Sequence, residues 1–478
     1  MKLRTLLLLL LLFPSLQAIA QNLTETNVAR VNEILMAAEQ AHGGEKLSSL
    51  RSMRVSTKDV NYAVGQSLKP NPPWDQNRSQ GFAAIDLENR IFVNQIHGDG
   101  GGFDFRNGTI IHGEESFQVN YRAGNAQPIA EPDFDNASGP FVRVTPPLLV
   151  RQLREHLRTA HYLGEVTDGD ESFDVVAFSM AVGPSISLYF DVSTHMLKRS
   201  ERVFAGFGLV QYRFDDYESV AGIPINQNFR LILNGDLNME RTNLATEINP
   251  DLSGISTLDP RLTVVEPVVP APLERQEIDD GVYLIGGQGT YAMFVEMSDH
   301  VIAVGGTAGI PARIELLKEV VADKPIKFGV LTHHHSDHVV GVQPYLNEGA
   351  TVIASAEHKG AVIDAAGEEV LRFKGVKQSL DLSDATRKVH VVDIGPTAHS
   401  EHLLVTWLPD QGVLFEADHF SRPATGPIQP AVESTRSFAR ALDRLKLNPQ
   451  RIVSAHSPRP GTAAELQQAL NTKPVSLD

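Results

Sequence analysis

The chain has 478 residues, of which 42% are hydrophobic and 21% charged, so it is long enough for two or three folded domains and is neither disordered nor fibrous. Its net charge of -16 makes it a poor partner for nucleic-acid phosphates. It has no cysteine, which excludes disulfides and thiolate ligands, so any metal must be held by histidine and carboxylate side chains.

The first twenty residues have the pattern of a cleaved secretory signal peptide. Lys2 and Arg4 supply positive charge, the run from Leu6 to Phe13 is apolar, and Ala18-Ile19-Ala20 offers the small residues preferred before a cleavage site. The apolar run is shorter than the roughly 20 residues that cross a bilayer, although an uncleaved anchor is the alternative. We therefore expect residues 1–20 to be removed, the mature chain to begin near Gln21, and the protein to be periplasmic or secreted.

Residues 21–249 predict a mostly antiparallel β domain with one or two helices, in the α+β class. Apolar residues recur at helical spacing from Val28 to Ala41, and Thr145 followed by Pro146 is typical of the start of a second helix. The glycine-rich run at 98–102 predicts a flexible loop. Alternating patterns predict strands at 84–94, 173–180, 185–191, 209–217 and 228–233.

The order of these segments is loosely similar to the half-barrels of periplasmic lipoprotein-carrier domains. The similarity lies in Leu188-Tyr189-Phe190-Asp191, Asp216-Tyr217 and Gly222-Ile223-Pro224. It implies a curved sheet that either packs on a second domain and shapes its substrate site, or holds an apolar ligand.

A proline-rich stretch at 250–273 predicts a linker, followed by a second domain at 274–478. Histidine is distributed unevenly about it: six of the 17 histidines precede residue 266 and eleven follow it. Such a surplus points to metal chemistry in the second domain.

The strongest motif follows a short apolar strand, Phe328 to Leu331. The chain continues as Thr332-His333-His334-His335-Ser336-Asp337-His338, which fits His-x-His-x-Asp-His. Alternation places His333 and His335 on one side of an extended segment, where both can reach one cation, and turns Asp337 and His338 toward a neighbouring one. His334 occupies an x position, so we expect it to be solvated or to lie outside the ligand set.

This part of the chain, roughly 275–478, resembles the metallo-β-lactamase fold hydrolases. After the motif, His399 in Thr397-Ala398-His399-Ser400 matches the family's third histidine of the first metal, with His402 as a competitor. Asp418 ends the apolar segment Val413 to Ala417 and matches the bridging aspartate. His456 ends the segment Ile452 to Ala455 and matches the last ligand.

The resemblance implies an αβ/βα sandwich with two cations, zinc by preference and iron or manganese as alternatives. Metal one takes His333, His335 and His399. Metal two takes Asp337, His338 and His456, and Asp418 bridges the pair. The chain differs from the family pattern at one position. The family usually has an aspartate after the strand Val301 to Val304, whereas this chain has Gly305-Gly306, which puts the rigidity of the site in doubt.

The function implied is hydrolysis of an ester, lactone or related carbonyl substrate by a metal-bound hydroxide, with Asp337 orienting the nucleophile or moving its proton. Asp418 favours the lactonase and thioesterase branches over the β-lactamases that have cysteine there. The alternatives are a β-lactamase, an iron-dependent oxygenase of the same fold, and a lipid- or ligand-binding protein without catalysis. A small-molecule substrate is expected, with no nucleic-acid partner and no membrane span; the sequence leaves the oligomeric state open.

Overall fold

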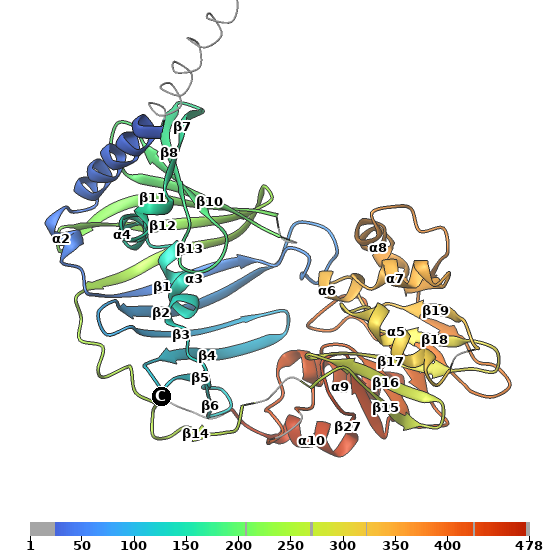
Figure 1. Ribbon diagram of the computed structural model, residues 1–478. Coiled ribbons are helices and arrows are strands. Elements are labelled where there is room, and N and C mark those ends of the chain that lie inside the picture. Colours follow the sequence, from blue (N-terminus) through green and yellow to red (C-terminus); the bar gives the residue numbers. More distant parts are fainter. Residues whose placement is uncertain (1–23, 206–207, 268–270, 322, 424–425, 475–478) are drawn as a thin grey trace, which may run out of the picture.

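The computed structural model describes residues 24–205, 208–267, 271–321, 323–423 and 426–474, and the predicted signal peptide lies outside them. Within these residues the strands form a 14-stranded sheet in the N-terminal domain and a 7-stranded and a 6-stranded sheet in the C-terminal domain. The stretch predicted as a linker, 250–273, contains β14 (Thr263–Val264), which forms one edge of the large sheet, and the next sheet begins with Glu274. Figure 1 shows the large sheet beside the smaller C-terminal sandwich. No described helix has the length and hydropathy needed to cross a bilayer.

The N-terminal sheet is antiparallel except at one edge, where β14 runs parallel to β6. Its strands are β1 Ser52–Tyr62, β2 Gln76–Asp86, β3 Ile91–Gly100, β4 Phe103–Ile111, β5 Phe117–Asn120, β6 Asn125–Pro128, β7 His161–Asp168, β8 Glu171–Phe178, β9 Ile186–Asp191, β10 Leu197–Phe204, β11 Gly208–Val220, β12 Ile223–Leu233, β13 Asp236–Ile248 and β14 Thr263–Val264. Its helices are residues 24–41, α2 Glu45–Ser48, α3 Phe134–Arg143, α4 Pro146–Glu155 and the 3₁₀ turn Leu157–Thr159.

One face of this sheet is packed against those helices. Leu35 of the first helix and Leu149 of α4 lie in one apolar cluster with Phe190 and Phe214 of the sheet, and all four are buried. The alternating pattern seen in the sequence follows from this arrangement, because only one face of each strand is covered. The α+β prediction for this domain is confirmed.

The structure corrects three details of the predicted elements. The expected strand at 84–94 is two strands, because the Asp86 carboxylate accepts the backbone N–H groups of Glu88 and Asn89 and folds the chain into a turn. Helix α3 was not predicted, since Pro140 lies inside it. The expected flexible loop at 98–102 is mostly the end of β3, which pairs with β4 through Gly100 and Phe103.

The C-terminal domain is a sandwich of two sheets with helices outside, and the predicted αβ/βα architecture is confirmed. The first sheet contains β15 Glu274–Asp279, β16 Val282–Gly287, β17 Thr290–Glu296, β18 Val301–Val304, β19 Ile326–Val330, β20 Thr351–Ser355 and β21 Phe373–Val376. The second contains β22 Ser379–Asp381, β23 His390–Asp393, β24 Leu404–Leu408, β25 Val413–Glu416, β26 Arg451–Ser454 and β27 Gly461–Thr462. The helices are α5 Ile310–Lys318, α6 Ser336–Val339, α7 Val342–Asn347, α8 Lys359–Ala366 with the 3₁₀ turn Ala356–His358 before it, α9 Glu433–Leu445 and α10 Ala463–Asn471.

Burial on both faces explains why central strands such as β16, β18 and β25 are continuous apolar runs. In β16, Val282 and Leu284 face the second sheet, whereas Tyr283 and Ile285 face α5 and its neighbours. Helices α9 and α10 cover the outer face of the second sheet in the same way. Strands covered on both sides lose the alternation typical of half-exposed sheets.

His42, at the end of the first helix, is expected to make stability depend on pH. It is fully buried, its Nδ1–H donates to the Ala38 carbonyl, and burial lowers its pKa to about 4. An unfolded chain binds this proton near pH 6.5, so the free energy of unfolding should fall by about 2–4 kcal/mol as the pH drops from 6.5 to 4. Urea titrations of His42→Phe should show a flatter pH dependence over this range, whereas the exposed-site control His161→Gln should keep the wild-type slope.

Candidate metal centre

The residues of the His-rich motif lie at one edge of the C-terminal sandwich. Strand β19 runs parallel to β18 and β20 and delivers the motif from its carboxyl end, the usual place for a ligand site in such sheets. The backbone N–H of Leu404 in the second sheet donates to the Thr332 carbonyl at 2.7 Å. This hydrogen bond fixes the loop between the two sheets.

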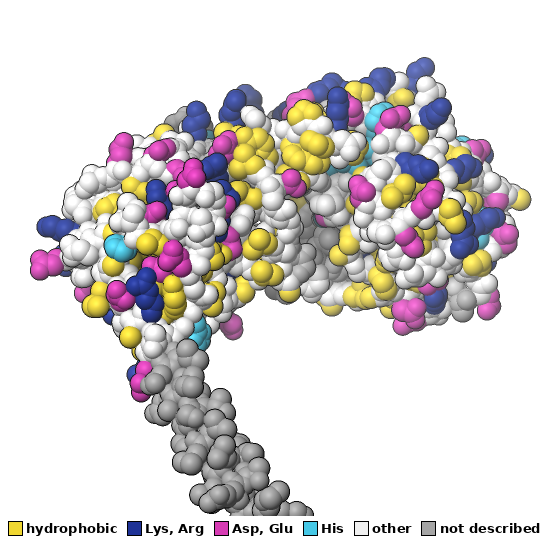
Figure 2. All heavy atoms as spheres, turned by 90° about the horizontal axis from the view of Figure 1, so that it is seen from above, with side chains coloured by type: hydrophobic (Ala, Val, Ile, Leu, Met, Phe, Trp, Pro, Cys, Tyr) yellow, Lys and Arg dark blue, Asp and Glu magenta, His cyan; other side chains and the backbone are white. Residues whose placement is uncertain are grey.

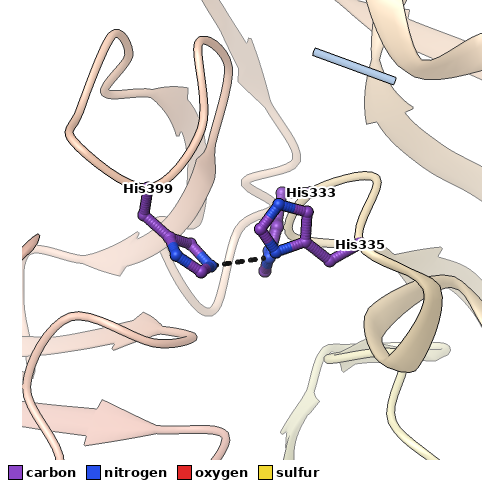
Figure 3. Close-up of side chains that lie close together, drawn as sticks. All are labelled: His333, His335 and His399. Carbon is purple, nitrogen blue, oxygen red and sulfur yellow. Dashed lines mark hydrogen bonds between the residues drawn. The ribbon is translucent and has the colours of Figure 1, made fainter. Parts of the chain in front are cut away.

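The second sheet delivers the other predicted residues to the same edge. Strands β25 and β26 are parallel, so Asp418, just beyond the first, and His456, just beyond the second, meet at one end. His399 comes from the loop between β23 and β24. Figure 3 shows His399 facing His333 and His335 across this edge.

Four imidazoles surround one carboxylate. Nε2 of His333, His338 and His399 lie 3.2, 3.2 and 3.1 Å from Oδ2 of Asp418, and Nε2 of His456 lies 2.9 Å from its Oδ1. The imidazoles also approach one another: His399 and His333, and His456 and His338, are each 3.2 Å apart between Nε2 atoms. The Asp337 carboxylate completes the group 3.4 Å from His338 Nε2.

The outer nitrogens of two of these rings are held by backbone carbonyls, which leaves their inner nitrogens available. Nδ1 of His399 lies 3.1 Å from the Gly101 carbonyl, and Nδ1 of His456 lies 3.3 Å from that of Gly289. In His335 the roles are reversed: Nε2 meets the Ser67 carbonyl at 3.0 Å, and Nδ1 is buried without a hydrogen-bond partner. Such outer partners select the tautomer that a ligating imidazole needs.

The imidazole rings of the centre differ in pKa, so that some are neutral and one is charged at neutral pH. Burial lowers the pKa of His333 well below its ordinary value, and the imidazoles of His338 and His335 lower it further. Burial and neighbouring rings likewise lower the pKa of His335 to about 3. Burial acts the same way on His338, but the Asp418 and Asp337 carboxylates outweigh it and raise its pKa to about 10.

Asp418 is the anion at the centre of this group. Burial alone would raise its pKa, but the contacts with His338, His399 and His456 hold it well below its ordinary value. The structure therefore combines a buried carboxylate, imidazoles of which some are held neutral, and two buried ring nitrogens without a hydrogen-bond partner, Nδ1 of His335 and Nδ1 of His338. This donor set suits a borderline divalent cation.

All seven residues predicted as ligands are brought together. The donor atoms form three groups, and within each group they lie no more than 4.8 Å apart, so each group could hold a metal ion. The groups are His333, His335 and His399; His333, His338 and Asp418; and Asp337, His338 and His456. That these residues bind metal stays a prediction.

Three further histidines near the centre, two of which the sequence analysis weighed, have other partners. His334 uses both ring nitrogens, one facing His358 at 3.2 Å and one facing the Ser67 carbonyl at 2.9 Å. The competitor His402 bonds to Asp393 at 2.7 Å. His419 is buried beside His399, with its Nε2 3.1 Å from the Thr397 hydroxyl.

Gly305-Gly306 gives the motif close backbone support. Gly305 has φ 106°, and its carbonyl accepts the Tyr345 hydroxyl. A Cβ at Gly306 would lie 2.1 Å from the His338 carbonyl oxygen, so only glycine permits this approach. The pair therefore packs directly against the histidine loop, where the sequence comparison expected an aspartate.

Sequence reasoning missed several residues beside the centre, and most of them belong to the N-terminal domain. Gln66 and Ser67 lie between β1 and β2, and Gly101 and Phe103 lie at the β3–β4 turn. The Phe103 ring stands edge-on to His399, with centroids 5.4 Å apart. No local pattern marks these residues, because their contacts span more than 260 positions of the chain.

A pocket of about 280 Å³ opens between the two domains next to Asp418. Its apolar walls include Phe103 and Phe105 from one domain and Phe420 and Ile428 from the other. Arg122 anchors one wall by donating to the carbonyls of Pro430 and Ala431 at 2.7 and 3.0 Å. Figure 2, from above, shows two lobes with a recess between them and both signs of charge interspersed.

The fold and the donor set together define a metallohydrolase-like domain. Residues 268–456 match the family model of the metallo-beta-lactamase superfamily, which confirms the resemblance seen in the sequence. The match covers residues 268–456, which include all seven residues predicted as ligands. The similarity of the N-terminal domain to lipoprotein carriers stays a prediction.

Solved structures that are similar to part of this chain include three metallo-beta-lactamases. They are the metallo-beta-lactamase FIM-1 from Pseudomonas aeruginosa in its mono-zinc form (21% identity, 42% of this chain and 93% of that one, TM-score 0.34), one from Hirschia baltica (19%, 41% and 96%, 0.33) and one from Pontibacter korlensis (17%, 42% and 97%, 0.35). At these TM-scores the likeness adds nothing to the family match. Among curated proteins, none matches this chain.

His399 and His402 provide a paired test of the ligand set. His399→Ala should weaken metal binding by more than about 100-fold, because even an outer partner of a metal ligand contributes about 10–100-fold. His402→Ala should leave it unchanged, because this ring is held by Asp393. Chelator competition and metal analysis of the purified variants would measure both. The reverse pattern would show that the ligand is His402.

Proposed function

We propose that this protein is an exported, dinuclear zinc-dependent hydrolase acting on an ester, lactone or related carbonyl substrate. The observation that carries the proposal is the convergence of four imidazoles on the Asp418 carboxylate, in a domain of the metallo-beta-lactamase superfamily. The signal-like sequence at residues 1–20 supports export.

Two ligand sets are proposed, sharing Asp418. One is His333, His335 and His399, and the other is Asp337, His338 and His456. When bound, the metal ions would supply acidified water and polarise the substrate carbonyl. The aspartate at position 418, rather than a cysteine, favours carbonyl substrates other than β-lactams, and β-lactam hydrolysis is the second candidate because of the family.

Asp337 has the exposure that a proton acceptor needs. Its side chain is 54% exposed, whereas that of Asp418 is only 11% exposed. Burial would raise the pKa of Asp337, but His338 and Gln66 outweigh it and lower the pKa. The carboxylate is therefore ionised at neutral pH, where it would orient a water molecule and hold its proton during attack on a carbonyl.

The interdomain pocket is the proposed binding site for the apolar part of the substrate. It borders Asp418, and its volume of about 280 Å³ fits a small molecule. Phe103 and Ile428 would contact that part, while the reacting carbonyl lies at the metal centre. The Arg122 guanidinium is occupied by Asp104 and two carbonyls, so it does not call for an anionic substrate.

Hydrolysis of a panel of esters, lactones, thioesters and β-lactams tests the reaction. We expect zinc-dependent turnover of at least one carbonyl class, reduced at least about 100-fold by His333→Ala, because loss of a ligand removes the acidified water. His390→Ala, a ring on β23 facing Asp381, serves as the control. Turnover that survives His333→Ala contradicts the proposal, and one iron per chain without hydrolysis would indicate an oxygenase.

The role of the pocket can be tested with Phe103→Ala. It should lower kcat/KM about 10-fold or more for substrates with large apolar groups and little for the smallest ones, because the lost contact area scales with the group it covers. Leu163→Ala, an exposed apolar residue on the distant edge strand β7, is the control. Equal losses for all substrate sizes would argue against binding in this pocket.

A further inference from the structure

The N-terminal domain contacts the metal centre through two short segments. The first is 65–67, between β1 and β2, and the second is 101–103, at the β3–β4 turn. Both lie outside the part of the chain that matches the metallo-beta-lactamase superfamily. Their hydrogen bonds end on three of the seven predicted ligands.

The first of these bonds fixes the orientation of His335. The Ser67 carbonyl has two lone pairs, and it faces Nε2 of both His334 and His335, at 2.9 and 3.0 Å. With its proton on Nε2, His335 has a lone pair on the buried Nδ1, which has no other partner. The same carbonyl holds His334 away from the ligand set.

The second bond fixes His399. Its Nδ1 donates to the Gly101 carbonyl at 3.1 Å, which leaves Nε2 as the nitrogen beside His333 and Asp418. The turn is anchored next to it, because the Ser434 backbone N–H donates to the Gly102 carbonyl at 2.7 Å. A Cβ at Gly102 would lie 2.8 Å from that of Ala398, so this approach requires glycine.

The third bond orients a carboxylate. Gln66 Nε2 donates to Oδ1 of Asp337 at 2.8 Å, and the other oxygen, Oδ2, faces His338. The segment is held in register by the Ser336 backbone N–H, which donates to the Gly65 carbonyl at 3.0 Å. Without Gln66, either carboxylate oxygen could turn toward the centre.

We propose that these two segments complete the metal centre from the N-terminal domain, and that Gln66 is a positioning residue that orients Asp337. The inference rests on the proposed function, since it requires that the seven residues bind metal. It assigns the N-terminal domain a direct part in the site, in addition to shaping the pocket. Metal binding and docking of the two domains are then coupled, and each stabilises the other.

Gln66 provides the sharpest test, because its side chain is exposed and its loss should not disturb the core. Gln66→Ala removes the donor, and Gln66→Glu places a second carboxylate against Asp337. The matched control is Lys69→Ala, two residues beyond the segment 65–67, which breaks an ion pair to Glu401, 3.3 Å away, that reaches no predicted ligand.

Zinc affinity is measured by chelator competition, and the Co²⁺-substituted proteins are compared by absorption spectroscopy. Gln66→Ala should weaken one of the two zinc sites by about 10–100-fold, the usual contribution of a partner of a metal ligand, and alter the Co²⁺ spectrum. Gln66→Glu should weaken it at least as much. Lys69→Ala should match the wild type, and thermal unfolding of the metal-free variants should be unchanged.

Two outcomes separate this inference from the proposed function. A wild-type protein that binds no zinc contradicts both. A wild-type protein that binds two zinc ions, with the same affinities and Co²⁺ spectrum in Gln66→Ala, contradicts only the role of Gln66 and the N-terminal domain. Weakened binding in Lys69→Ala equal to that in Gln66→Ala would show that general domain docking, rather than orientation of Asp337, sets the affinity.

Discussion

The site depends on one electrostatic problem: the Asp418 carboxylate is buried among four imidazole nitrogens that lie 2.9–3.2 Å away. Protonation of the imidazoles compensates the carboxylate charge only in part, because neighbouring rings cannot all be charged at this distance. The pKa of His333 is lowered, so this ring is neutral, while that of His338 is raised, so this ring is charged. A divalent cation would compensate the carboxylate charge fully, since it can bind several neutral imidazoles and a carboxylate at once. Imidazoles this close together would repel one another if all were protonated, but the same arrangement is well suited to binding metal.

The C-terminal sandwich keeps these side chains close together because it is rigid at the strand ends that precede them. Strands β18 and β20 in one sheet and β25 and β26 in the other are almost wholly buried, as is the carboxyl end of β19, and these carboxyl ends meet at one edge. Close packing there leaves little room for relaxation. Gly305-Gly306 adds support by letting the backbone at His338 approach within contact distance.

How far the sequence predicted the structure depended on the range of the interactions involved. The motif His333 to His338 and the strand-end positions of Asp418 and His456 were readable, because each follows a local apolar run. Helix α3 was missed because Pro140 hides it, and the turn at Asp86 was missed because a side-chain hydrogen bond interrupts an apolar pattern. The sequence around Gln66 gives no indication of its role, since that role depends on a hydrogen bond to Asp337, 271 residues away.

That last contact changes how the two domains are related. The seven candidate donor residues lie in the part of the chain that matches the superfamily, but carbonyls from the N-terminal domain face one ring nitrogen of His335 and one of His399. Tautomer selection at a ligand contributes directly to metal affinity, so the free energy of domain docking and that of metal binding share these hydrogen bonds. Because coupling of this kind is reciprocal, separation of the domains would weaken metal binding to the same extent that metal strengthens their docking. The N-terminal domain is thus a physical component of the centre, and its large helix-backed sheet keeps the two segments in place.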